Sequence, residues 1–369
     1  MTNKNTNWKY NRPFLLKPAG KDYLWGGSRL NDDFAKGIDL EPLAETWECS
    51  THPDGPSLAA SGEHAGKLLT EVLKEHPEYL GTHPHTDGEL PILIKFIDAR
   101  QDLSVQVHPD DDYAREHENG SLGKTEMWYV MDATKDARLI YGFYHDIDKE
   151  TLRQSLEQGT VEKYLQKVPV KKDDVFYIEA GTVHAIGAGA LIAEVQESSN
   201  LTYRMYDYNR VDKYGRHREL HIEKALEVAN LHGSAEPRQP MRVLRYKKGC
   251  ASELLCRCKY FQVERQLINT ERYREMADIR TGSNSFQVLL CIGGCGVLFE
   301  ENGESLNFFK GDCLFLPADS VPLKIHGRAQ MLNGREQNHG AVPDLAGECQ
   351  GGSGCGERTS GNRRRRSTD

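Results

Sequence analysis

The chain of 369 residues predicts a mainly β fold with two related β-barrels and a few helical insertions. Short runs of β-branched and aromatic residues, bounded by turn residues, outnumber the segments with helical spacing. Segments 172–180 and 310–318 share one pattern of a turn, an apolar strand and a second turn. Because this pattern occurs once in each half, we expect two copies of one strand arrangement.

The first strand-rich block is expected to hold strands and inserted helices. Strand patterns lie at 13–17, 91–98, 138–143, 174–179 and 191–196. Apolar residues at helical spacing predict helices over 66–76, 149–167 and 222–228. We therefore expect an N-terminal catalytic domain over 1–240, in which the helices at 66–76 and 149–167 are insertions.

A second block begins near residue 242, with strand patterns at 260–267, 285–292, 296–300 and 312–316. The glycine-rich stretch 293–296 is interpreted as a hairpin turn, since it lacks the lysine of a phosphate-binding loop. These patterns predict a C-terminal domain of related fold over 241–332. It has no Gln-x-His pattern, and after its second turn it has no histidine at the offset that His184 occupies in the first copy, so we expect it to be metal-free and structural.

Residues 333–369 differ from the rest in composition. They are rich in Gly, Arg, Glu, Gln and Ser, and four arginines occupy positions 363–366. Such a segment cannot bury enough apolar surface to offset its ordering entropy, so we expect a disordered tail. An arginine run can bind nucleic acid or act as a localisation signal, but most such runs are solvated tails.

The net charge of -8 argues against nucleic acid or an anionic membrane as the main partner. No apolar run reaches about 18 residues, and the first residues lack the apolar stretch of a secretion signal. We therefore expect a cytoplasmic protein with no membrane partner. In that reducing compartment, the nine cysteines are expected to be free thiols.

Metal-ligand side chains occur at strand spacing in the first block. Gln106 and His108 share one face of a strand pattern, because side chains alternate along a strand. Glu126 and His184 lie in two further strand-like runs. A single histidine in a strand is more often a hydrogen-bonding residue than a ligand. The combination of two imidazoles, a carboxylate and an amide predicts a mononuclear metal site.

Four runs, at 103–111, 123–129, 180–187 and 202–208, resemble the short bacterial branch of the type I mannose-6-phosphate isomerases. Segments 24–27, 44–48 and 218–220 resemble the same family, and the match is collinear from residue 13 to residue 332. The resemblance implies cupin-type, jelly-roll barrels, one zinc ion per chain, and interconversion of mannose 6-phosphate and fructose 6-phosphate. The tail beyond residue 333 departs from the family pattern, and its role stays open.

Aldose–ketose isomerisation moves a proton between adjacent carbons through an enediol, which requires a base and charge stabilisation. Two imidazoles and a carboxylate suit Zn²⁺, so His108, Glu126 and His184 are the expected ligands, with Gln106 as a weaker fourth. Glu194 and Lys124 are both candidates for proton transfer, and the sequence does not choose between them. Glu194 is alternatively a hydrogen-bond partner of a metal-bound histidine.

Arg204 lies among aromatic residues and is always cationic, so it can stabilise an enediolate. The resemblance implies that it is an active-site residue. Since the chain has no P-loop, side chains are expected to hold the substrate's phosphate, and the resemblance points to Ser104, with Arg204 and Lys124 nearby. Arg210 and Lys213 are further candidates, although loop charges of this kind are more often solvated.

Two other functions fit the same residues. Two histidines and a carboxylate are also the iron-binding set of non-haem oxygenases, which predicts a cupin oxygenase as one alternative. A non-catalytic sensor that binds a sugar phosphate is the other. The oligomeric state and the direction of flux are not determined by the sequence.

Overall fold

A computed structural model describes residues 11–82, 89–212, 214–239, 242–272 and 275–337. Within these ranges the protein is mainly β, as predicted, and its strands form three antiparallel sheets of six, five and ten strands. This arrangement is compatible with a cupin-type fold. No helix in the described ranges is long and apolar enough to span a membrane.

Two of the sheets come from the N-terminal half. The six-stranded sheet has the order β10 (Val175–Ile178), β7 (Glu126–Ala133), β12 (Ala190–Glu197), β5 (Ile92–Asp98), β3 (Glu45–Cys49) and β2 (Ala19–Lys21). The five-stranded sheet has the order β13 (Tyr203–Tyr206), β6 (Val105–Val107), β11 (His184–Ile186), β8 (Arg138–Phe143) and β9 (Leu165–Pro169). One apolar cluster joins them, with Trp128 and Ile192 from the first sheet and Leu139 and Ile186 from the second.

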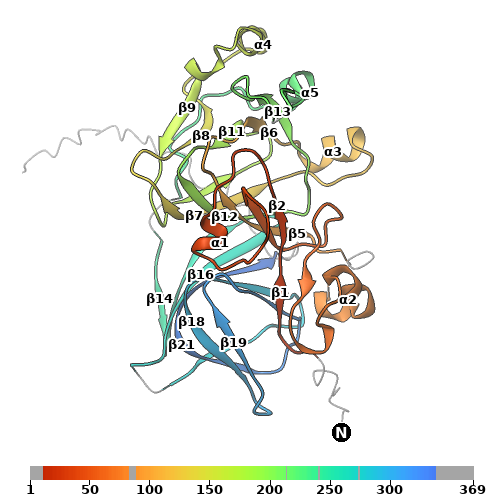
Figure 1. Cartoon of the computed structure of the whole chain (residues 1–369), viewed down its shortest axis with the longest axis vertical. Helices are drawn as coiled ribbons and strands as arrows, with labels where there is room; N and C mark the ends of the chain where they lie inside the picture. The colour runs from red at the N-terminus through yellow and green to blue at the C-terminus, as the bar shows by residue number, and fades with distance from the viewer. Residues whose placement is uncertain (1–10, 83–88, 213, 240–241, 273–274, 338–369) are drawn as a thin grey trace, which may run out of the picture.

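The ten-stranded sheet contains all the strands of the C-terminal half and two from the N-terminal half. Its order is β14 (Arg245–Lys247), β15 (Cys250–Arg257), β16 (Phe261–Asn269), β21 (Leu323–Glu336), β18 (Gln287–Glu300), β20 (Cys313–Leu316), β1 (Phe14–Lys17) and β4 (Leu58–Ala59), with β17 (Ala277–Ile279) on β21 and β19 (Ser305–Phe309) on β18. In Figure 1, β1 lies beside these C-terminal strands. The division of the chain at residue 240 stays a prediction, and an N-terminal strand completes the C-terminal sheet.

The helices are short and lie outside the sheets. They are α1 (Arg29–Asp32), α2 (Leu69–Glu75), α3 (Asp111–His117), α4 (Lys149–Glu157) and α5 (Ile222–Val228), with 3-10 turns at Gly62–His64, Pro77–Leu80 and Val161–Lys163. The predicted helices over 66–76 and 222–228 are present as α2 and α5. The sequence analysis missed α3, although Asp110 caps it by accepting a hydrogen bond from the Tyr113 backbone N–H at 2.9 Å.

Three of the expected elements differ from the structure: one helix end, one turn and the start of the tail. The helix predicted over 149–167 ends at Glu157, because Gly159 adopts a left-handed φ of 67°, and Leu165 lies in strand β9. The stretch 293–296 is not a hairpin turn but part of the continuous strand β18, where its glycines accompany a β-bulge between Cys291 and Gly293. The tail does not begin at 333, because β21 continues to Glu336 and pairs with β16. Residues 338–369 lie outside the described ranges.

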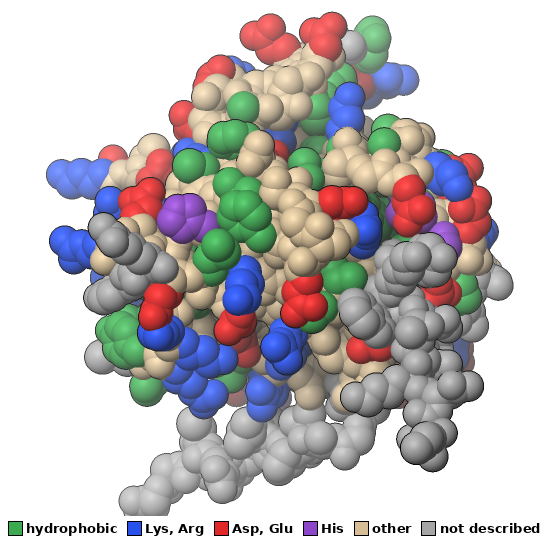
Figure 2. All heavy atoms as spheres, turned by 90° about the horizontal axis from the view of Figure 1, so that it is seen from below, with side chains coloured by type: hydrophobic (Ala, Val, Ile, Leu, Met, Phe, Trp, Pro, Cys, Tyr) green, Lys and Arg blue, Asp and Glu red, His purple; other side chains and the backbone are tan. Residues whose placement is uncertain are grey.

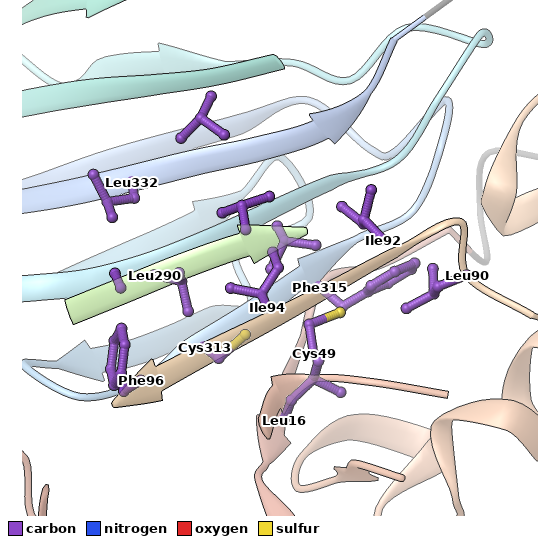
Figure 3. Packing of buried hydrophobic residues seen from close by; sticks show 14 of the residues in the cluster. Leu16, Cys49, Leu90, Ile92, Ile94, Phe96, Leu290, Cys313, Phe315 and Leu332 are labelled. Atoms are coloured by element: carbon purple, nitrogen blue, oxygen red, sulfur yellow. The ribbon is translucent and has the colours of Figure 1, made fainter. Parts of the chain in front are cut away.

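The six-stranded sheet is buried on both faces. One face carries Ile92, Ile94 and Phe96 of β5, which pack with Leu290 and Leu332 of the C-terminal strands in a single core (Figure 3). Because side chains alternate along a strand, the opposite face of the same strands points toward the five-stranded sheet. That second face carries the polar residues described below, and the apolar packing behind it holds them in place.

A buried ion pair within the N-terminal half lies next to a contact with the C-terminal half. Lys36 Nζ lies 2.7 Å from Glu48 Oε2, and the two side chains are 4% and 0% exposed. Glu48 also accepts a hydrogen bond from Thr46 Oγ1 at 2.5 Å, and Lys36 donates to the carbonyl of Gly311 in the turn before β20. On the outer surface, by contrast, Figure 2 shows Lys, Arg, Asp and Glu side chains interspersed with small groups of hydrophobic ones.

Candidate metal centre and active site

Strand pairing aligns three of the predicted site residues across the five-stranded sheet. Gln106 of β6 is the register partner of His184 on β11 and of Arg204 on β13. Residues in register on neighbouring antiparallel strands point to the same face. Arg204, Gln106 and His184 therefore form one row, and His108 follows β6 directly.

A second row faces them from the six-stranded sheet. Glu194 of β12 is the register partner of Trp128 on β7 and of Lys95 on β5. Glu126 lies two positions before Trp128, on the same face, at the start of β7. The site is thus built between two sheets, and strand register sets the positions of Gln106, His184, Arg204 and Glu194.

His108, Glu126 and His184 form a buried cluster in which one ligand atom of each lies within 4.8 Å of the others. His184 Nε2 is 3.3 Å from Glu126 Oε1, and His108 Nε2 is 3.7 Å from Glu126 Oε2. Neither oxygen of Glu126 receives a hydrogen bond of good geometry from the described residues. Since buried polar atoms normally have partners, this set of donors fits a divalent metal ion.

The hydrogen bonding and the pKa values of the two histidines suit them to bind a metal ion. His184 Nδ1–H donates to the Thr182 carbonyl at 2.8 Å, which leaves the lone pair of Nε2 directed at Glu126. Burial lowers the pKa of His184 to about 4, and burial, with the nearby charge of Lys124, holds the pKa of His108 well below its usual range. Both imidazoles are therefore neutral near pH 7, as metal ligation requires.

Burial and the neighbouring Glu194 raise the pKa of Glu126 to about 7. Lys124 Nζ lies 3.1 Å from both Glu126 Oε2 and His108 Nε2. The amide of Gln106 also reaches the cluster, with Nε2 at 3.4 Å from His184 Nε2. Rotation of this amide by 180° would direct Oε1 at the same point, which is the orientation that a fourth ligand needs.

A cavity of about 260 Å³ opens beside the cluster. Five of the residues selected from the sequence line it, namely Ser104, Gln106, Lys124, Glu194 and Arg204. The guanidinium of Arg204 donates to the Glu219 carbonyl at 2.9 Å, while its Nε has no hydrogen-bond partner among the described residues. The predicted metal and substrate residues thus converge on one space.

Among the described residues, no hydrogen bond joins Glu194 to a histidine; its Oε2 accepts from Trp128 Nε1 at 2.9 Å. Its Oε1 lies 3.4 Å from Lys95 Nζ, a residue that the sequence analysis missed. Burial favours the neutral form of Glu194, but the charges of Lys95 and Lys124 outweigh it and hold its pKa below the usual value. A lysine within the apolar strand 92–98 was the available signal for Lys95.

The sequence analysis also missed Arg218 as a lining residue of the cavity. Its guanidinium is held by Asp207, with Nε to Oδ2 at 2.8 Å and Nη2 to Oδ1 at 2.6 Å. Arg210 contacts the same carboxylate at 2.5 Å but does not line the cavity. Lys213 lies outside the described residues. Arg204 and Arg218 therefore give one wall of the cavity two positive charges.

Comparison with known proteins identifies the family. Residues 14–137 match the model of the phosphomannose isomerase type I catalytic domain. Mannose-6-phosphate isomerase ManA of Bacillus subtilis is 38% identical over 325 residues, which cover 87% of this chain and 98% of that protein. The chain belongs to the type I mannose-6-phosphate isomerase family. A second B. subtilis member, the putative mannose-6-phosphate isomerase YvyI, is 37% identical over 328 residues with the same coverage.

The solved structures agree with this membership. The crystal structure of the B. subtilis mannose 6-phosphate isomerase superposes with a TM-score of 0.80 at 36% identity, covering 88% of this chain and 99% of that one. A mannose 6-phosphate isomerase solved with zinc bound shares the fold at 16% identity, with a TM-score of 0.68. Membership in an isomerase family favours an isomerase over the iron oxygenase and the non-catalytic sensor.

A carboxyl pair beside the centre leads to a prediction about pH. Glu197 Oε1 accepts a hydrogen bond at 2.7 Å from the backbone N–H of Thr125, the residue before Glu126. Burial and the neighbouring Asp111 raise the pKa of Glu197 to about 8. The folded protein therefore retains a proton that the unfolded chain releases above about pH 4.5. This contribution to stability is fully present below pH 4.5 and is lost as the pH rises through about 8.

Between these two pH values, we expect Glu197 to make the free energy of unfolding fall by about 1.4 kcal/mol for each pH unit. Glu197→Gln should flatten that decline, because glutamine cannot titrate. Denaturant unfolding of both proteins at pH 5, 6.5, 8 and 9 measures the difference. Parallel pH profiles of wild type and variant would show that Glu197 does not hold the proton.

Proposed function

We propose that the chain is a zinc-dependent isomerase that interconverts mannose 6-phosphate and fructose 6-phosphate through an enediol. The observation that carries the proposal is the buried His108–Glu126–His184 cluster at the side of a cavity lined by Glu194, Lys124 and Arg204. Family membership adds support, because the B. subtilis relatives carry the name of this enzyme. The substrate class follows from that name and from the cationic wall of the cavity.

His108, Glu126 and His184 would hold the zinc ion, with the amide oxygen of Gln106 as a fourth ligand. When bound, zinc supplies a positive charge that polarises the oxygens on the two reacting carbons. The buried setting strengthens this effect, since the effective dielectric constant is lower than in water. The two cationic groups of Arg204 and Arg218 lie on the wall where the anionic end of the substrate would bind.

The proton transfer needs a group that is deprotonated at neutral pH. Glu194 meets this condition, because Lys95 and Lys124 keep its carboxylate ionised. We assign it the role of the base that takes the proton from one carbon and returns it to the other. Lys124, whose ammonium group lies beside Glu126, is placed to donate a hydrogen bond to the substrate oxygens.

We assign Arg204 the role of stabilising the negative charge that develops on the enediolate. Its guanidinium remains cationic although burial and the neighbouring Arg218 lower its pKa. Ser104, which is 3% exposed and lines the same cavity, offers a hydroxyl to the phosphate together with the ammonium of Lys124. The positive charges of Arg204 and Lys124 would thus stabilise both the enediolate and the bound phosphate.

A coupled assay tests the whole proposal. Purified protein is supplied with mannose 6-phosphate, and the formation of fructose 6-phosphate is followed before and after treatment with a chelator. Activity should disappear with the metal and return when zinc is added. Turnover that persists in metal-free protein, or the absence of turnover in zinc-loaded protein, would refute it.

Arg204→Lys separates chemistry from binding at this position. Lysine keeps the charge but not the planar guanidinium, so we expect kcat to fall by about 10²-fold or more, comparable to the loss of an oxyanion donor. Zinc content should be unchanged, because Arg204 is not a ligand. Steady-state kinetics with metal analysis give both values. An effect on KM alone would restrict Arg204 to holding the phosphate.

Glu194→Gln tests the assignment of the base. The amide keeps the shape of the side chain but cannot accept a proton, so kcat should fall by roughly 10²- to 10⁴-fold. Glu45→Gln is a matched control, since Glu45 also lines the cavity and lies 3.9 Å from Lys95. Exchange of the substrate's C2 proton with deuterated solvent should be lost only in the Glu194 variant. Loss in both variants would point to Lys95 instead.

A further inference from the structure

The interior face of the C-terminal sheet changes from apolar to polar at one end. Ile268 of β16 and Met331 of β21 belong to the apolar cluster on this face. Asn333 lies two positions after Met331 on β21, and Gln266 lies two positions before Ile268 on β16. Because side chains alternate along a strand, Asn333 and Gln266 point to the same face as this apolar cluster. Register pairs Glu264 with Asn333 and Gln262 with Arg335 across the two strands.

These polar residues line a cavity of about 350 Å³. Gln262, Gln287 and Asn333 are 2%, 8% and 9% exposed, which is unusual for amides. Hydrogen bonds hold all three in place. Asn333 Nδ2 donates to Gln287 Oε1 at 2.9 Å, while Gln262 Nε2 donates to Glu264 Oε1 at 2.6 Å and Gln262 Oε1 accepts from Arg257 Nε at 2.8 Å. The cavity therefore has a polar lining that is fixed before any ligand binds.

Asn333 Oδ1 is buried and has no hydrogen-bond partner in the described part of the chain. An unpaired buried acceptor costs free energy unless a ligand or water satisfies it. The cations that line the cavity are Lys247, Arg280 and Arg335, against two carboxylates, Glu264 and Asp278. None of the three cations forms an ion pair with another described residue.

We propose that this cavity binds a small anion that carries hydroxyl groups, such as a sugar phosphate or a sugar acid. Arg335 and Arg280 hold the anionic group, and the unpaired Oδ1 of Asn333 accepts a hydrogen bond from a hydroxyl group. The site belongs to the C-terminal sheet and shares no lining residue with the cavity at the metal centre. It gives the second half of the chain a binding role in addition to its packing role.

Calorimetric titration of the zinc-loaded full chain tests the proposal with two probes that cannot be isomerised, sorbitol 6-phosphate and gluconate. Arg204→Ala is used to weaken binding at the metal centre, so that the remaining binding reports the C-terminal cavity. We expect one site for at least one probe in this background, and an affinity about tenfold lower or worse after Arg335→Ala is added. Asn333→Asp, which keeps the size of the side chain, should weaken binding similarly by charge repulsion.

Arg328→Ala is the matched control, because Arg328 is an exposed residue on the same strand outside the cavity. It should leave binding unchanged, and Arg335→Ala alone should leave isomerase turnover unchanged. The proposal is overturned if neither probe binds in the Arg204→Ala background, or if binding survives both Arg335→Ala and Asn333→Asp. Equal binding of inorganic phosphate would overturn the assignment of Asn333 Oδ1 to a hydroxyl group. These outcomes do not depend on whether the metal centre catalyses the proposed reaction.

Discussion

His184→Ala, Glu126→Ala and His108→Ala should each remove most of the bound zinc and reduce isomerase turnover by about 10³-fold or more. Each variant leaves two of the three clustered ligands, and a buried site with one ligand missing loses most of its affinity. Elemental analysis of the purified proteins gives the zinc content, and the coupled assay gives the turnover. Both values should fall together.

The control for these variants is His64→Ala. His64 is also buried, at 5% exposure, but its Nε2 contacts the hydroxyl of Tyr79 at 3.1 Å and lies outside the cluster. This variant should retain zinc and turnover even if its stability falls. A ligand variant that turns over at the wild-type rate without zinc would contradict the assignment of the metal centre.

Lys36→Met should destabilise the protein by about 3–5 kcal/mol, because it leaves the Glu48 carboxylate buried without a countercharge. Burial already raises the pKa of Glu48 even in the presence of Lys36. Removal of the ammonium would therefore force Glu48 to take up a proton or the chain to unfold locally. Denaturant unfolding monitored by tryptophan fluorescence measures the change.

Two comparisons sharpen this test. The double variant Lys36→Met/Glu48→Leu removes both charges and should recover much of the lost stability, since an apolar pair can replace a buried ion pair. Arg153→Met breaks the surface pair with Glu223 and should have little effect, because both side chains contact water. If Lys36→Met were as stable as wild type, Glu48 would not depend on Lys36 as its countercharge.

The clustering of His108, Glu126 and His184 was largely predictable, whereas the boundaries of several elements were not. Gln106 and His108 share a face because of strand alternation, which a sequence displays directly. Leu165 was assigned to a helix because its spacing of four residues from Val161 fits helical periodicity. The left-handed backbone at Gly159 ends the helix, and a 3-10 turn at Val161–Lys163 precedes strand β9. Local spacing contains no information about which strand a residue will pair with.

The same limit explains the residues that the sequence analysis missed at the cavity. Lys95 is placed by its register with Glu194, and Arg218 by its two hydrogen bonds to Asp207. Neither partner can be read from neighbouring positions. Asn333 was placed in the tail because the polar composition changes there, although backbone pairing with Glu264 extends the strand. Tertiary pairing overrides composition at such positions.

Strand β1 also determines when the protein can finish folding. Asn11 donates a buried hydrogen bond at 2.8 Å to the carbonyl of Ala318, 307 positions away, and β1 pairs with β20 beside it. On the ribosome, β1 emerges well before β20, so at ~5–20 residues per second it waits roughly 15–60 s for this partner. Contacts at such separation slow folding. Although β4 can pair with one edge of β1 early, the edge that later pairs with β20 stays open to other nascent chains in that interval. Chaperone demand during synthesis should therefore depend on β1 more than on any strand of the metal centre.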